Sequence, residues 1–175
     1  LVTAAERHPD TASFASRLLM ANRPWLFDGA GDLYHACGLP WRARHGQPVP
    51  HYPEPDCEVF SACAAAALYR RELFEALGGL DEDYFCYLED VDLGFRLGLA
   101  GWRCRYIPSA VARHVGSATS GRRSDFATYH GHRNLVWTFV KDMPGILLWL
   151  YLPQHVFLTL VECCVFLARG QGHVI

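Results

Sequence analysis

A nearly unbroken apolar stretch from Ile146 to Ala168 is the feature that most restricts how this chain folds. As one helix, its 23 residues would be about 34 Å long, enough to cross a bilayer. Pro153 lies near the middle, however, and Glu162 would be costly in hydrocarbon. The pattern favours two amphipathic helices that lie on a membrane surface or against the domain, with a spanning helix and a soluble core helix as alternatives. Three aromatic residues suit a membrane interface: Trp137, Trp149 and Tyr151.

The composition of the whole chain is that of a folded domain. Of its 175 residues, 51% are hydrophobic and 19% are charged, which excludes general disorder. The net charge of -2 excludes the basic footprint of a nucleic-acid-binding protein. Seven cysteines without a Cys-x-x-Cys pair predict reduced thiols of a cytosolic protein rather than a zinc site or a disulfide framework.

The first 68 residues mix apolar and turn-forming segments. Residues 11–19 are typical of a buried strand. The many prolines of residues 22–55, together with the turn signal Asp28-Gly29-Ala30-Gly31-Asp32, predict a long irregular segment. The small apolar run over residues 59–68 fits either a buried strand or the start of a tightly packed helix.

Regular helical spacing begins after this run. The apolar residues of 70–77 predict a helix that ends at Gly78-Gly79, and those of 88–100 predict a second helix that ends at Gly101. Two strands are predicted to follow, separated by Pro108: residues 102–107 and 110–115.

The acidic residues are concentrated between these two helices. Six of the 18 acids fall within twelve positions: Asp81, Glu82, Asp83, Glu89, Asp90 and Asp92. Interleaved aromatic residues indicate a lined cleft, and Cys86 stands where a calcium loop of the EF-hand type would need glycine. Glu89 and Asp90 fall in the first turn of the second helix, where the helix dipole favours negative charge. A carboxylate placed there can act as a general base toward a hydroxyl group.

The stretch from Phe60 to His114 carries a specific series of motifs. After the small-residue run come Arg70-Arg71, Gly78-Gly79, Asp81-Glu82, Glu89-Asp90, an Arg, a Gly, a Tyr-x-Pro and His114. This series resembles the C-terminal half of the catalytic domain of family-2 glycosyltransferases, especially the bacterial rhamnosyltransferase-like group. The similarity extends from about Glu6 to Asn134. Leu80 departs from the family's usual Phe.

The resemblance implies an α/β fold, the C-terminal half of a GT-A (Rossmann-like, nucleotide-diphospho-sugar transferase) fold with a mixed sheet, flanking helices and C-terminal amphipathic helices. Residues 1–134 would form the acceptor and catalytic half of the domain, and residues 135–175 amphipathic helices that associate with a membrane. The family's Asp-x-Asp motif and nucleotide-binding strands would precede Leu1. The chain is therefore expected to be a C-terminal fragment that is inactive by itself.

The resemblance also implies roles for individual residues. Asp90 would be the base that deprotonates the acceptor hydroxyl, and Glu89 would orient the acceptor or the base. His114 would be one ligand of a Mg or Mn ion bound to the donor diphosphate, with the main ligands expected upstream of Leu1.

Further roles follow from the same likeness. Arg122 and Arg123 would close over the diphosphate, and Asp81 and Glu82 would line the acceptor site. The segment His132-Arg133-Asn134 matches the start of the family's C-terminal helices and is interpreted as structural.

The function implied is that of an inverting glycosyltransferase in cell-envelope polysaccharide synthesis, cytoplasmic and peripheral on the inner face of the cell membrane. Subgroup likeness suggests dTDP-rhamnose as the nucleotide-sugar donor and a glycan or polyprenyl diphosphate as the acceptor. Two alternatives stay open: a metal-dependent nucleotide-sugar hydrolase, and a non-catalytic membrane-associated remnant or glycan-binding module.

Overall fold

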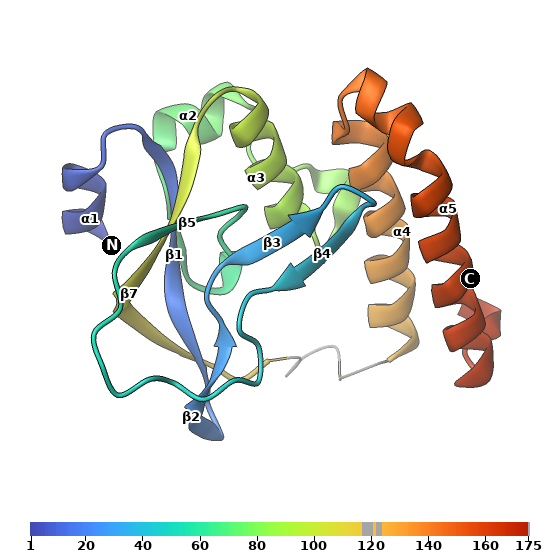
Figure 1. The fold of residues 1–175 in the computed structure, drawn as a ribbon, viewed down its shortest axis with the longest axis horizontal. Coiled ribbons are helices and arrows are strands. Elements are labelled where there is room, and N and C mark those ends of the chain that lie inside the picture. Colours follow the sequence, from blue (N-terminus) through green and yellow to red (C-terminus); the bar gives the residue numbers. More distant parts are fainter. Residues whose placement is uncertain (117–120, 122–123, 175) are drawn as a thin grey trace. The chain divides into compact units, whose positions relative to one another are not determined.

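The computed structural model describes residues 1–116, 121 and 124–174 of the chain. The chain folds into two compact units (Figure 1). Unit 1 is made of Leu1–Leu33, Pro40–Asp81 and Asp90–Gly116. Unit 2 is made of Tyr34–Leu39, Glu82–Glu89 and the described residues beyond Gly116.

A mixed sheet organises unit 1. Its strands are β1 (Thr11–Met20), β2 (Arg23–Gly29), β5 (Cys57–Val59), β6 (Ala67–Tyr69) and β7 (Arg103–His114). They lie in the order β2-β1-β7-β5, with β6 also paired to β1. Only the β1–β7 pair is parallel among the pairings described, and the other strands run antiparallel to their neighbours. The sheet confirms the predicted mixed α/β class and the predicted strand over residues 11–19.

The prediction that Pro108 separates two strands is wrong. Strand β7 runs through this proline, and the register against β1 shifts there, because Ile107 pairs with Ser16 whereas Val111 pairs with Arg17. Proline has no N–H to give to a ladder and is tolerated in strands at such irregular positions. The shift therefore accommodates the proline without ending the strand.

The prediction of an irregular segment over residues 22–55 is also wrong in part. Strand β2 lies within it, as do β3 (Asp32–His35) and β4 (Leu39–Arg42), which pair with each other. Pro24 is tolerated because β2 is the edge strand of its sheet. The small apolar run is divided between a 3₁₀ turn, Ala64–Ala66, and strand β6.

Three helices belong to or enter unit 1: α1 (Val2–Arg7), α2 (Arg71–Ala76) and α3 (Glu89–Leu99). Both predicted glycine stops are confirmed. Gly78 has a φ of 81°, and the next amide, of Gly79, donates to the carbonyl of Phe74. Gly101 has a φ of 86°, and the amide of Trp102 donates to the carbonyl of Leu97. These are the bonds that close a helix end on a left-handed residue.

The buried face of α3 fixes that helix on the sheet. Leu93 and Leu97 are buried together with Ala12 of β1. On the same helix, Gly94 approaches Ser61 so closely that a Cβ at position 94 would overlap the serine side chain. The middle of α3 is therefore held against the segment that leads into the Ala64–Ala66 turn.

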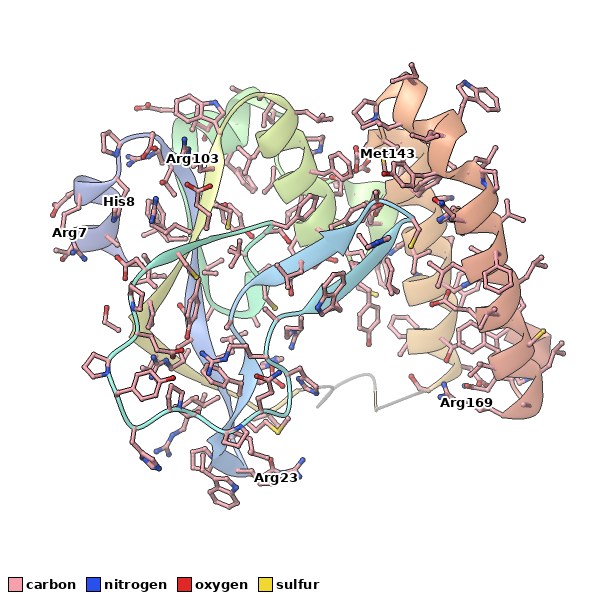
Figure 2. All side chains as sticks on the ribbon, viewed as in Figure 1. Arg7, His8, Arg23, Arg103, Met143 and Arg169 are labelled. Carbon is pink, nitrogen blue, oxygen red and sulfur yellow. The ribbon has the colours of Figure 1, made fainter. Side chains whose placement is uncertain are left out.

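Unit 2 contains the 3₁₀ turn Glu82–Tyr84 and two long helices, α4 (Asp125–Asp142) and α5 (Gly145–Ala168). Ser124 caps α4, its hydroxyl accepting from the amide of Ala127 at 3.1 Å. Met143, labelled in Figure 2, lies between α4 and α5. The prediction of two helices within residues 146–168 is wrong, because α5 continues through Pro153. The division into regions 1–134 and 135–175 stays a prediction.

Candidate active site

The carboxylate of Asp90 lies in the first turn of α3, as the sequence predicted. Its Oδ2 accepts a hydrogen bond from the backbone N–H of Ala64 at 2.9 Å, and its Oδ1 one from the N–H of Val91 at 2.9 Å. Each carboxylate oxygen has two lone pairs, so each keeps one for a further donor. Asp90 is half-buried, and its carboxylate is therefore both fixed by the backbone and open to a hydroxyl group.

A second carboxylate, that of Asp32, lies in the field of the first. Asp32 is buried, and burial together with the negative charge of Asp90 raises its pKa from 3.8 to about 7. The guanidinium of Arg42, 4.0 Å away, and a hydrogen bond from Ser61 at 3.3 Å act in the opposite direction. In the sequence Asp32 is part of a turn signal, and nothing there marks it as a site residue.

Arg42 links this carboxylate to a third one. Its Nη1 donates to Oδ2 of Asp28 at 2.7 Å, and its side chain is only 32% exposed. Gly29 makes room for the stem of this side chain, because a Cβ at position 29 would overlap Cδ and Cγ of Arg42. Arg42 and Asp28 were both absent from the residues predicted for the site.

His114 lies at the end of a strand, as predicted, and is the last residue of β7. It contacts Asp28, the acid to which Arg42 also donates. Its Nδ1 lies 2.8 Å from Oδ2 of Asp28. An imidazole that donates from Nδ1 to a carboxylate has Nε2 free as a hydrogen-bond acceptor or metal ligand. Among the described residues, no group of three His, Cys, Asp or Glu side chains is arranged to hold a metal ion.

Asp90 and His114 thus belong to the same unit and contact different partners. Asp90 interacts with Ala64 and with the charge of Asp32, whereas His114 binds Asp28. Arg42 lies between the two acidic residues Asp28 and Asp32. The structure brings the two predicted residues into one network of charges rather than into direct contact.

The remaining predicted site residues stay predictions. Asp81 is half-buried, Glu82 is exposed at the start of the 3₁₀ turn Glu82–Tyr84, and Glu89 is the first residue of α3. Arg122 and Arg123 lie outside the residues that the structure describes.

Unit 2 contributes an unusual backbone just before Glu89. Phe85, Tyr87 and Leu88 have φ angles of 62°, 67° and 66°. Residues other than glycine are uncommon in this left-handed region, and bulky ones are genuine outliers there. Such strain is concentrated at functional sites in proteins. No signal in the sequence predicts it, because the segment contains no glycine or asparagine.

Comparison with known proteins places this region in a functional context. Residues 58–134 match a family model described as glycosyltransferase-like family 2. The chain is 51% identical, over 65 residues, to an N-acetylglucosaminyl-diphospho-decaprenol L-rhamnosyltransferase of Mycobacterium tuberculosis, a match that covers 36% of this chain and 21% of that protein.

Two further relatives are similar. Rhamnosyltransferase WbbL of Escherichia coli K12 is 45% identical over 57 residues, which cover 32% of this chain and 22% of WbbL. The O-antigen biosynthesis protein RfbC of Myxococcus xanthus is 32% identical over 110 residues, which cover 59% of this chain and 8% of RfbC. The matches thus span at most about a fifth of the length of these relatives.

Proposed function

We propose, from the match of residues 58–134 to the glycosyltransferase-like family 2 model, that the protein is an inverting glycosyltransferase of cell-envelope polysaccharide synthesis. It transfers a sugar from a nucleotide-diphosphate donor to a glycan or lipid-linked acceptor. The observation that carries the proposal is the placement of Asp90, whose carboxylate is held by two backbone amides and stays open to solvent.

Asp90 acts as the general base in this proposal. Its carboxylate takes the proton from an acceptor hydroxyl while that oxygen forms a bond to the anomeric carbon of the donor. The bond from the anomeric carbon to the diphosphate breaks, and the diphosphate leaves with the electron pair, which inverts the anomeric centre. General-base action of this kind contributes about 10²- to 10⁴-fold to the rate. Glu89, next to the base, orients the acceptor together with Asp81 and Glu82.

The finer specificity rests on the relatives. Two of them are named rhamnosyltransferases, one acting on N-acetylglucosaminyl-diphospho-decaprenol. We therefore propose dTDP-rhamnose as the donor and a polyprenyl-diphosphate-linked sugar as the acceptor. Arg122 and Arg123 are proposed to bind the donor diphosphate, as the family likeness implies.

A divalent cation, Mg or Mn, is proposed as the cofactor, and the residues present fit one ligand position. His114 donates from Nδ1 to Asp28, which leaves Nε2 available, and a carboxylate behind a histidine is the usual support of a metal-binding imidazole. The cation would neutralise the negative charge that develops on the leaving diphosphate. Asp28 would keep the imidazole of His114 in the required tautomer.

Membrane association of the protein is supported by α5. In the described residues, this helix of 24 residues is long and apolar enough to cross a membrane. Only 6% of its most apolar stretch of 18 residues is buried. Its exposed apolar residues include Ile146, Trp149, Leu150, Phe157, Leu160 and Leu167. We propose that α5 attaches the protein to the inner face of the cell membrane, close to a lipid-linked acceptor.

The test is sugar transfer by the full-length protein, from labelled dTDP-rhamnose to N-acetylglucosaminyl-diphospho-polyprenol. Asp90→Asn is expected to lower transfer by at least about 100-fold while the dissociation constant of the donor stays the same. Glu72→Gln, which neutralises an exposed acid on α2, serves as the control and is expected to keep full transfer. Near wild-type turnover of Asp90→Asn would refute the assignment, and sugar release that needs no acceptor would favour a hydrolase.

A further inference from the structure

One face of α4 holds the left-handed segment that precedes Glu89. The side chain of Asn134 is completely buried, and its Nδ2 donates to three converging carbonyl oxygens, at 3.0, 2.8 and 2.7 Å: those of Tyr84, Cys86 and Tyr87. An amide nitrogen has only two protons, so the three acceptors share them. The carbonyls can converge in this way because Phe85 and Tyr87 adopt the left-handed region.

Arg133 fixes the orientation of this amide. Its Nε donates to Oδ1 of Asn134 at 2.9 Å, which leaves Nδ2 to face the carbonyls. Its Nη2 donates to the carbonyls of Asp83 and Tyr84 at 3.0 and 2.9 Å. The guanidinium lies 4.3 Å from the ring centre of Trp137, a cation–π contact that holds the arginine in place.

The next turn of α4 completes the arrangement. Thr138 donates to the backbone carbonyl of Asn134 at 2.9 Å, and its hydroxyl lies 3.1 Å from that of Tyr84. Because the threonine proton is already used, the tyrosine donates in this pair. Tyr84 is 1% exposed, whereas Phe85, the next residue, is 73% exposed. The segment is therefore anchored at one residue and turned outward at the next.

We propose that Asn134 is a positioning residue, which holds Phe85, Tyr87 and Leu88 in the left-handed conformation and so sets the orientation of Glu89, the first residue of α3. This inference rests on the proposed function, because it assigns the strained segment to the orientation of Glu89, which is proposed to orient the acceptor. Asn134 acts through the backbone and touches no reacting atom. The interpretation of His132-Arg133-Asn134 as merely structural is thereby refined.

The test compares Asn134→Asp with Asn22→Asp in the full-length protein. The first change keeps the shape of the side chain and replaces its two donors by an acceptor that faces three carbonyl oxygens. The second makes the same chemical change at an exposed turn. Asn134→Asp is expected to lower kcat at least tenfold with the KM for the donor within twofold of wild type, whereas Asn22→Asp leaves both unchanged.

A rescue variant separates positioning from a general loss of folding. Glycine adopts a positive φ without steric cost, so Leu88→Gly in the Asn134→Asp background is expected to restore kcat at least threefold. Failure of this rescue, or a kcat of Asn134→Asp equal to wild type, would overturn the proposal. If Asn134→Asp does not fold, Arg133→Lys replaces it in the test. This change keeps the charge and loses the fork of donors, and it is also expected to lower kcat.

Hydrogen exchange gives a readout that does not depend on activity. In Asn134→Asp, the amides of residues 84–89 are expected to exchange at least tenfold faster, while those of β1 keep their rates. Unchanged exchange in residues 84–89 would refute the role of Asn134. Absence of sugar transfer by the wild-type protein would instead refute the proposed function, so the two failures are distinguishable.

Discussion

Replacing the buried Asp32 by Asn is expected to remove a specific part of the pH dependence of stability. In the folded protein, burial and the charge of Asp90 raise the pKa of Asp32 from 3.8 to about 7. An acid whose pKa is higher in the folded than in the unfolded protein binds an additional proton on folding at any pH between the two values. The contribution of this proton to the free energy of unfolding is complete below about pH 3.8 and is lost as the pH rises to about 7.

The size of the effect follows from the same two values. Between pH 5 and pH 7 the unfolded chain has lost the proton of Asp32 and the folded protein has kept it. Two pH units at about 1.36 kcal/mol per unit amount to about 3 kcal/mol. The wild-type protein should therefore lose about 3 kcal/mol more of its free energy of unfolding between pH 5 and pH 8 than Asp32→Asn does.

The measurement is urea unfolding at pH 5 and pH 8, in a detergent that covers the exposed apolar residues of α5. Glu72→Gln is the matched control, because it neutralises an exposed acid of the same unit and should leave the pH dependence of the wild type unchanged. Equal pH dependence in the wild type and Asp32→Asn would show that Asp32 is ionised throughout this range. That result would contradict the inference that the charge of Asp90 raises the pKa of Asp32.

Two further changes test the packing and the proposed metal ligand. Gly94→Ala should destabilise the protein by about 1–3 kcal/mol, because the new Cβ overlaps Ser61. Gly98→Ala on the same helix meets open space and should stabilise the protein by about 0.5–1 kcal/mol. Equal urea midpoints for the two variants would contradict the packing of α3. Asp28→Asn should weaken Mn binding about 10- to 100-fold, because the imidazole of His114 loses the carboxylate that orients it. The affinity is measured by Mn titration of the full-length protein. An unchanged affinity would argue against His114 as a ligand.

The elements that the sequence predicted are those whose signals are local. The helices α2 and α3 combine apolar spacing with a glycine stop, and both signals act within a few residues. Strand β2 (Arg23–Gly29) could not be predicted, because its proline argues against a strand and only the sheet order shows that β2 is an edge. The prediction that Pro108 ends a strand was wrong for a related reason. A register shift can be recognised only once the partner strand is known.

The same distinction explains the site. Asp90 and His114 could be named because they lie in a motif series that resembles a known family, whereas Asp28 and Asp32 flank two glycines and are typical of an exposed turn. Burial makes these two acids functional candidates. For Asp32, that burial involves Ser61, a residue 29 positions further along the chain. No local pattern encodes such a contact, so their altered chemistry could not be predicted.

The segment before Glu89 shows the limit most clearly. Its residue types favour right-handed or extended backbone, and Phe85, Tyr87 and Leu88 nevertheless adopt the left-handed region. The hydrogen bonds that oppose this preference come from Asn134, 47 to 50 positions later. A glycine at any of the three positions would remove the steric cost and would also let the segment move. Bulky residues held by distant donors instead leave the backbone one stable conformation, which is what Glu89 needs in its proposed role of orienting an acceptor hydroxyl group in a fixed direction.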